Sequence, residues 1–234
     1  MNELIIETFH KNGLELTLEQ ANLFNIYLNL LLKYNQEFNL TAITDKKEII
    51  LKHFVDSCLL NDTFKQGCTV CDVGSGAGFP AIPLKILRPD LKITMIDSLN
   101  KRVEFLKTVT NQLNLSDITA FHSRAQEFCA SSRESFDYTT ARAVAPLNIL
   151  SELCLPITKL GGAFVAFKSQ DAENDIKNAE NAINILGGKI AEIKQITLKS
   201  DTEFFVRKQI IIEKISPTPI QYPRLKDKIT KSPL

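Results

Sequence analysis

The stretch most suited to chemistry is residues 71–86, CDVGSGAGFPAIPLKI, in which three glycines fall within five positions. An apolar run typical of a strand ends near Asp72, and a helical pattern begins after Gly78. Because glycine has no Cβ, backbone N–H groups and a helix N-terminus can come close to a bound molecule there. The stretch therefore predicts a ligand-binding turn between a strand and a helix.

Three ligands compete for this turn. A triphosphate loop needs a Lys-Ser or Lys-Thr pair after its last glycine, and none follows here. A dinucleotide loop has its third glycine one position later, where Phe79 stands. S-adenosylmethionine is favoured, because its cationic groups suit the carboxylate of Asp72 whereas a diphosphate would be repelled. A turn that only joins strand to helix is the alternative.

A second acid, Asp97, ends the next predicted strand, ITMID. Its carboxylate can accept hydrogen bonds from ribose hydroxyls, as an acid at this spacing also does in NAD-binding folds. Asp97 thus supports an adenosine-containing ligand without choosing between the two cofactors. The spacing of the glycines and Asp72 favour S-adenosylmethionine.

The elements around the turn alternate between strand and helix. From residue 68 onward, short β-branched runs alternate with helical stretches, which predicts an α/β fold with a mostly parallel sheet and helices on both faces. The last two predicted strands, 190–198 and 204–215, are joined by too few residues for a crossover. They are expected to pair antiparallel.

Three regions follow from the patterns. Residues 1–62 form a helical extension, with apolar positions at helical spacing in 18–34 and a helix over about 46–60 capped by Asp45. Residues 63–215 form the α/β domain, and residues 216–234, a basic segment with four of the nine prolines, form an extended tail.

Composition limits the class of protein. The chain of 234 residues is 44% hydrophobic and 24% charged, as expected of a globular domain with an appendage. No signal segment or long apolar run is evident, so we expect a cytoplasmic protein that does not enter a membrane. The net charge of +1 disfavours a uniformly basic nucleic-acid binder. Residues 194–234 nevertheless carry nine bases against four acids, which suits a polyanion as well as a solvated face.

The five cysteines are scattered and odd in number, so we expect reduced, buried thiols rather than a disulfide framework. Cys68 and Cys71 form a C-x-x-C, but a zinc site would need a second pair of ligands. The three histidines are too far apart in sequence to supply it, and no metal is expected.

Motifs along nearly the whole chain carry a more specific likeness. In order they are YNQEFNLTAI, HFVDSCLL, DVGSGAGFPAIPLKI, DSLNKRVEFLK, RAQEF, ARAVAPL and YPR. Together they resemble the bacterial RsmG (GidB) family of 16S ribosomal RNA guanine-N7 methyltransferases. The resemblance implies a class I S-adenosylmethionine-dependent methyltransferase fold, Rossmann-like with a seven-stranded sheet and a helical N-terminal extension. The implied partner is 16S ribosomal RNA, free or within an assembling small ribosomal subunit, and no obligate protein partner is evident.

The resemblance also implies a set of site residues. By that similarity Gly74 and Phe79 line the cofactor site, Ala125 and Gln126 lie near the adenine, and Arg142 lies between cofactor and substrate at the end of the fourth strand. The tail departs from the family pattern, because Leu225 follows YPR where a glycine is usual. With the turn, the expected cofactor-binding set is Asp72, Gly74, Gly76, Gly78, Phe79, Asp97, Ala125, Gln126 and Arg142.

The chemistry expected of N7 methylation needs little from the protein except alignment. N7 of guanine has an in-plane lone pair and no proton, so no general base is required, and in-line positioning can lower the barrier by several kcal/mol, up to about 7–11. Arg142 is the expected catalytic residue, since its fork can contact guanine O6 or a phosphate. A structural ion pair with Asp137 is its alternative. Cys71 and Cys129 lie near cofactor motifs but are interpreted as structural.

Further side chains are candidates for contact with RNA, namely Asn39, His53, Lys168, Tyr222 and Arg224. Each has a plainer interpretation: a turn cap for Asn39, a helix-surface pair with Asp56 for His53, a solvated lysine at 168, and a tail packed on its own domain.

Other functions stay open from the sequence. A methyltransferase with a small-molecule or protein acceptor fits the same cofactor turn, because the fold fixes the cofactor better than the acceptor. A noncatalytic nucleotide binder or a nicotinamide enzyme is also compatible, although a second βαβαβ half is not evident for the latter.

Overall fold

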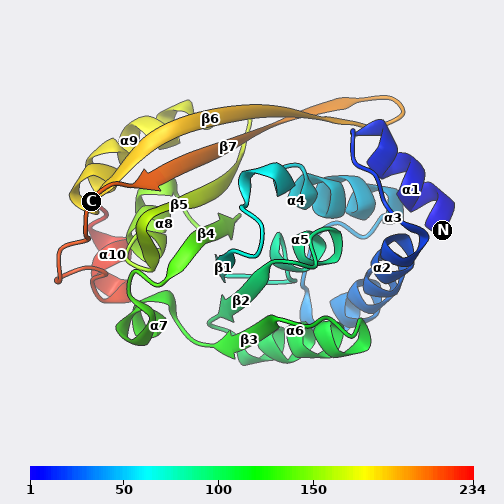
Figure 1. Ribbon diagram of the computed structural model, residues 1–234, viewed down its shortest axis with the longest axis horizontal. Helices are drawn as coiled ribbons and strands as arrows, with labels where there is room; N and C mark the ends of the chain where they lie inside the picture. The colour runs from blue at the N-terminus through cyan, green and yellow to red at the C-terminus, as the bar shows by residue number, and fades with distance from the viewer.

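The computed structural model describes residues 1–234 and is built around one seven-stranded sheet (Figure 1). The strands are β1 (Thr69–Val73), β2 (Lys92–Asp97), β3 (Ile118–His122), β4 (Phe136–Arg142), β5 (Thr158–Ser169), β6 (Gly188–Lys199) and β7 (Phe204–Lys214). Their order is β3-β2-β1-β4-β5-β7-β6. The first five are parallel, and β7 runs antiparallel to β5 and β6. The predicted sheet and its antiparallel final pair are confirmed.

Helices cover both faces of this sheet, on opposite sides of the strands in Figure 1. One face carries α1 (Asn2–Lys11), α2 (Leu18–Phe38), α3 (Lys46–Ile49), η1 (Ile50–Val55), α4 (Asp56–Cys58), η2 (Asn61–Thr63), α5 (Ala81–Leu87) and α6 (Asn100–Gln112). The other carries α7 (Ala125–Ser132), α8 (Leu147–Cys154), α9 (Glu173–Ile185) and α10 (Lys226–Lys231). Buried clusters of 37 and 19 residues fill the two interfaces, and adjacent β5 residues such as Val165 and Phe164 point into different ones.

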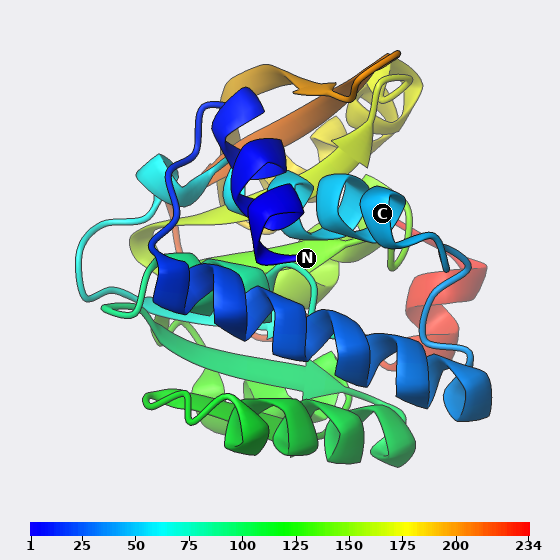
Figure 2. The ribbon, with the colours of Figure 1, turned by 90° about the vertical axis from the view of Figure 1, so that its right-hand side faces the viewer.

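The N-terminal extension shares its core with the sheet. The first cluster contains both Phe24 of α2 and Val70 of β1. Thr17 and Gln20 form a capping box at the start of α2, and the Gln20 amide also donates to the carbonyls of Ile86 and Leu87 at the end of α5. Figure 2 shows α2 running beside α6. The extension is therefore held in one position against α5 and α6, two of the helices that cover this face.

The helix predicted over 46–60 is present but irregular. Asp45 caps it by accepting a hydrogen bond from the backbone N–H of Glu48, as expected. Its middle, Ile50–Val55, is a π-helix between two short α-helical segments. Single π turns often occur at functional sites, because the extra residue per turn changes the direction of the side chains that follow.

The tail differs from the predicted extended segment, since it contains α10 and packs on the domain. The guanidinium of Arg133 donates to the carbonyls of Thr218, Pro219 and Tyr222. Ile229 of α10 is only 1% exposed. The proline spacing suggested an irregular chain but did not reveal this single apolar anchor.

All five cysteines are buried and unpaired. None of the helices has both the length and the apolar character that crossing a bilayer requires.

Candidate functional site

The glycine turn lies at the carboxyl edge of β1 and is fixed to the neighbouring strand. The backbone N–H groups of Gly74 and Ser75 both donate to the carbonyl of Ile96 in β2. The N–H of Gly76 donates to a carboxylate oxygen of Asp97 at 2.9 Å, and the other oxygen accepts from Leu99 N–H at 2.9 Å. The parallel register of β1 and β2 thus brings the turn and the second predicted acid together.

Each of the three glycines is suited to its position for a different structural reason. A Cβ on Gly74 would lie 2.8 Å from the side chain of Val144, so no side chain fits there. Gly78, with φ of +97°, packs against Ile82 and Tyr27. Gly76 has φ of +58°, and a Cβ there would meet nothing closer than a carbonyl oxygen at 3.9 Å. Space for a ligand therefore opens over Gly76, whereas Gly78 shapes the turn.

Asp72 is fully buried beneath the turn, and half of its carboxylate lacks a partner. Oδ1 accepts from the Thr140 hydroxyl of β4 at 2.8 Å, while Oδ2 has no hydrogen-bond partner. Burial raises the pKa of Asp72 to about 7, although the Thr140 hydrogen bond and the Arg142 charge oppose the shift. An unpartnered buried acceptor is costly, so a cationic ligand at this edge would relieve an existing strain on the fold.

Two connected hollows extend from this turn. One, of about 490 Å³, is lined by the turn itself with Thr41, His53, Phe79, Arg102 and Arg142. The other, of about 210 Å³, lies over the ends of β2 and β3 and is lined by Ile96, Ser98, Ala125, Gln126 and Val144 among others. Asp97 and Gly74 line both. The predicted adenine-side residues Ala125 and Gln126 thus lie in the same cleft as the turn.

Arg142 ends β4 at the opposite side of this cleft and is held by the irregular helix. It forms an ion pair with Asp56, Nη1 to Oδ2 at 3.0 Å, in which the two side chains are only 12% and 8% exposed. Its Nη2 donates to His53 Nδ1 at 2.8 Å. Nε–H and the second Nη2 hydrogen have no partner in the protein, so Arg142 keeps donors free for a ligand.

His53 and Phe79 complete this group. Their rings stack with centroids 4.6 Å apart, and the Arg142 guanidinium carbon lies 4.9 Å from the Phe79 centroid. Burial, with the nearby Arg142 charge, lowers the pKa of His53 to about 3. Because neutral His53 accepts from Arg142 at Nδ1, its Nε2 carries the proton and donates to the Thr41 hydroxyl at 2.8 Å. Both ring nitrogens of His53 are therefore hydrogen-bonded, and its role is to hold Arg142 in position.

Asp56 and Arg142 correct two sequence-based interpretations. Asp56 is buried rather than part of a helix-surface pair, and burial raises its pKa even though Arg142 and Arg207 lower it. The structural ion pair considered for Arg142 exists, but its partner is Asp56 and not Asp137, which pairs with Lys159 at 2.8 Å. Spacing showed only that His53 and Asp56 share a helix face.

Lys168 and Asn39 both have structural roles within the protein. Lys168 is 13% exposed; it pairs with Asp175 at 2.7 Å and donates to the carbonyl of Ala145. It therefore supports the segment after Arg142 instead of projecting into solvent. Asn39 is exposed and ends α2 in the left-handed conformation, as a cap does.

The tail candidates lie away from Arg142, against α8. Arg224 forms an ion pair with Glu152 at 2.6 Å and also donates to the carbonyl of Ser232. Glu152 is 1% exposed, so this pair is internal. Tyr222 packs beside the second core cluster. The arrangement supports a tail packed on its own domain.

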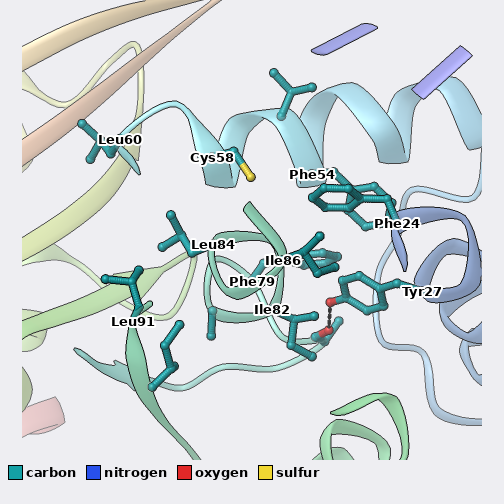
Figure 3. Packing of buried hydrophobic residues seen from close by; sticks show 14 of the residues in the cluster. Phe24, Tyr27, Phe54, Cys58, Leu60, Phe79, Ile82, Leu84, Ile86 and Leu91 are labelled. Atoms are coloured by element: carbon teal, nitrogen blue, oxygen red, sulfur yellow. Dashed lines mark hydrogen bonds between the residues drawn. The ribbon is translucent and has the colours of Figure 1, made fainter. Parts of the chain in front are cut away.

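Sequence reasoning missed Tyr27, which connects the extension to the turn. Its hydroxyl donates to the carbonyl of Ala77, as the dashed line in Figure 3 shows, and its ring lies among Phe24, Phe54 and Phe79. Tyr27 lies on the apolar stripe of α2, where a tyrosine is most simply read as core. Its hydroxyl was the one signal that a polar partner had to be nearby.

Comparison with known proteins gives a consistent family. A family model described as rRNA small subunit methyltransferase G matches residues 20–204. Ribosomal RNA small subunit methyltransferase G of Ligilactobacillus salivarius is 47% identical over 229 residues, covering 95% of this chain and 94% of its own. The protein of the same name from Clostridium beijerinckii is 45% identical, covering 99% and 98%.

Solved structures agree on the fold. An S-adenosylmethionine-dependent methyltransferase from Aquifex aeolicus superposes with a TM-score of 0.55 at 17% identity, over 74% of this chain and 96% of its own. A precorrin-6y C5,15-methyltransferase from Geobacter metallireducens gives 0.54 at 14% identity, over 69% and 88%. At these identities the likeness shows the fold alone, which is the class I arrangement expected from the resemblance.

Proposed function

Because the chain belongs to the rRNA small subunit methyltransferase G family, we propose that it transfers a methyl group from S-adenosylmethionine to N7 of one guanine in 16S ribosomal RNA. Family membership makes the chain an S-adenosylmethionine-dependent rRNA methyltransferase. The proposal adds four points: the methylated atom is N7, the base is a guanine, the acceptor RNA is free or within an assembling small subunit, and the protein acts in the cytoplasm.

The residues at the turn fit the cofactor. The space over Gly76 and the unpartnered Oδ2 of Asp72 are both features that a cationic adenosine derivative would use. Asp97 would hold the ribose, Ala125 and Gln126 the adenine side, and Gly74, Gly76 and Phe79 the remaining wall, while Gly78 keeps the turn in shape. When bound, S-adenosylmethionine supplies a methyl group on a positively charged sulfur, which a lone pair can attack directly.

The acceptor side of the cleft suits a nucleophile that needs no deprotonation. His53 has both nitrogens engaged and a pKa near 3, and Asp56 is paired with Arg142, so neither is a free general base. Guanine N7 requires none. Arg142, with unused donors facing the cleft, would orient the base through O6 and so align N7, which is a positioning contribution.

A further hollow of about 380 Å³ continues from Arg142 away from the turn and carries the basic side chains Lys52, Lys168, Arg207 and Lys208. This continuity is the observation that best supports the proposal, because three residues, His53, Arg142 and Ala143, line both the cofactor cleft and a basic cleft. Phosphates of the RNA would lie along it, with His53 and Lys168 at its wall, while Asn39, exposed at the end of α2, would contact RNA outside this hollow. RNA contact by Tyr222 and Arg224 stays a prediction that only RNA binding can test.

The test uses 16S RNA and small subunits from a strain that lacks this protein. Labelled S-adenosylmethionine and wild-type protein should place one methyl group on one guanine, located by nuclease digestion and mass spectrometry. Binding should weaken steeply with salt if phosphates are contacted. Transfer to free guanosine or to a protein, with none to RNA, would favour the small-molecule or protein acceptor instead.

A further inference from the structure

The hollow over the ends of β2 and β3 has one wall that comes from the C-terminal tail. Lys226, Ile229 and Thr230 of α10 line it, opposite Asp97, Ser98 and Ala125. The match to the family model ends at residue 204, before the tail begins. The tail and the cofactor side of the cleft, far apart in sequence, therefore meet at one place.

The position of α10 is fixed by a buried anchor on α8. Glu152 receives three hydrogen bonds from Arg224, one from its backbone N–H and two from its guanidinium. A carboxylate that is 1% exposed would be costly without this partner, so the pairing holds residue 224 firmly to α8. The amide of Asn148, also on α8, donates to the carbonyl of Leu234 beyond α10.

The same helix α8 supplies the floor between the anchor and the hollow. Ile149 and Leu153 of α8 line the hollow beside Ile229. Anchored at both ends to α8, the segment 225–234 lies across the opening with Ile229 turned inward. Lys228, on the same helix, is exposed and does not line the hollow.

We propose that α10 is the outer wall of the adenine subsite, held there by the buried Ile229, with Lys226 and Thr230 at its edge. The inference rests on the proposed binding of S-adenosylmethionine in this cleft. A purine is flat and apolar on its faces, and Ile149, Leu153 and Val144 offer such a surface beside the hydrogen-bonding groups at the strand ends, while Ile229 is buried behind it. The tail thus contributes to cofactor affinity.

The chain has no tryptophan, so a single introduced indole can report binding without background. Lys226→Trp places it at the edge of the hollow, and Lys228→Trp places it two residues away on the exposed face. Titration of each full-length variant with S-adenosylmethionine, and then with methylthioadenosine, which lacks the amino acid, should change the fluorescence of Lys226→Trp only. A silent Lys226→Trp, or equal responses from both variants, would overturn the proposal.

A second measurement gives the affinity. Ile229→Ala should raise the dissociation constant of both ligands by about tenfold, since the buried apolar contact that holds α10 at the adenine side is lost, while Lys228→Ala should leave it unchanged. Calorimetry gives the constants, and the ligand-free unfolding midpoint shows whether each variant is folded. Unchanged or tighter binding by folded Ile229→Ala would sink the idea. If wild-type protein binds neither ligand, the cofactor assignment itself fails, which is a different result.

Discussion

The turn after β1 and the group around Arg142 lie on two sides of one cleft, yet they are built differently. The turn presents backbone groups and open space over Gly76, and beneath it lies a buried carboxylate oxygen with no partner. The Arg142 group presents charges that are already paired with Asp56 and held by His53. On the turn side a buried acceptor lacks a hydrogen-bond partner, whereas on the Arg142 side the charges are paired and only a few donors are free. Such a difference suits a tightly held cofactor and a briefly held acceptor.

The comparison is tested most strongly at Arg142. Arg142→Ala should lower the rate of methyl transfer by about a thousandfold, because a preorganised donor to the acceptor is lost. Cofactor affinity, measured by calorimetry, should change little. The structure adds a stability cost of about 3 kcal/mol, since Asp56 would remain buried without its main partner.

A matched double variant separates the two effects. Removing the acid as well, in Arg142→Ala/Asp56→Ala, should recover much of the lost stability in denaturant unfolding but none of the activity. Activity regained together with stability would mean that Arg142 acts only as a structural ion pair.

On the cofactor side the largest effect is expected at Asp97. Asp97→Ala removes the proposed ribose acceptor and the carboxylate that fixes Gly76 N–H, and should weaken S-adenosylmethionine binding about 100-fold. Asp90→Ala is the control, because Asp90 likewise accepts from a glycine N–H, that of Gly67, but lies outside the cleft. Equal losses in the two variants would remove Asp97 from the site.

A subtler pair compares two glycines of similar backbone conformation. Gly76 and Gly67 have φ of +58° and +67°, and an added Cβ would clash with nothing at either position. Alanine at each should cost a similar amount of stability, about 1 kcal/mol. Only Gly76→Ala should also weaken cofactor binding, by about tenfold, because its methyl group would occupy ligand space. A Gly76→Ala protein with wild-type affinity would show that the turn is not the cofactor cradle.

The two sides also differ in how far sequence could predict them. The turn could be predicted from local spacing, since three glycines and Asp72 lie within seven residues. The position of Asp97 beside them follows from the alternation of strands and helices, because this alternation predicts parallel strands whose carboxyl ends lie at one edge of the sheet. The Arg142 group could not, because Asp56 and Arg142 are 86 residues apart and meet only through the π-helical turn. The fold was predictable for the same reason as the turn, because local sequence patterns determine both. The position of α10 was not, because it depends on one buried isoleucine and on an ion pair between Arg224 and Glu152, which are far apart in sequence.

A last expected effect, on stability and its dependence on pH, follows from the proton on Asp72. Its pKa in the folded protein is about 7, above its ordinary value of 3.8, so between about pH 4 and 7 the folded state binds the proton that the unfolded chain has lost. Cofactor-free stability should therefore fall as pH rises through this window and level off above it, by on the order of 4 kcal/mol in all. Asp72→Asn, compared with wild type by denaturant unfolding at pH 5 and pH 8, should lose this dependence.

Binding of a cationic ligand reverses the balance at Asp72, because a positive charge beside Oδ2 favours the ionised carboxylate. At pH 7 the wild-type protein should then release up to about half a proton on binding S-adenosylmethionine, seen as a heat that varies with the ionisation enthalpy of the buffer. Asp72→Asn should release none, and the Arg142 group gives no reason for release, since Asp56 keeps its partner. Binding heats that do not depend on buffer in wild type would mean that the orphaned oxygen is not where the positive charge comes to lie.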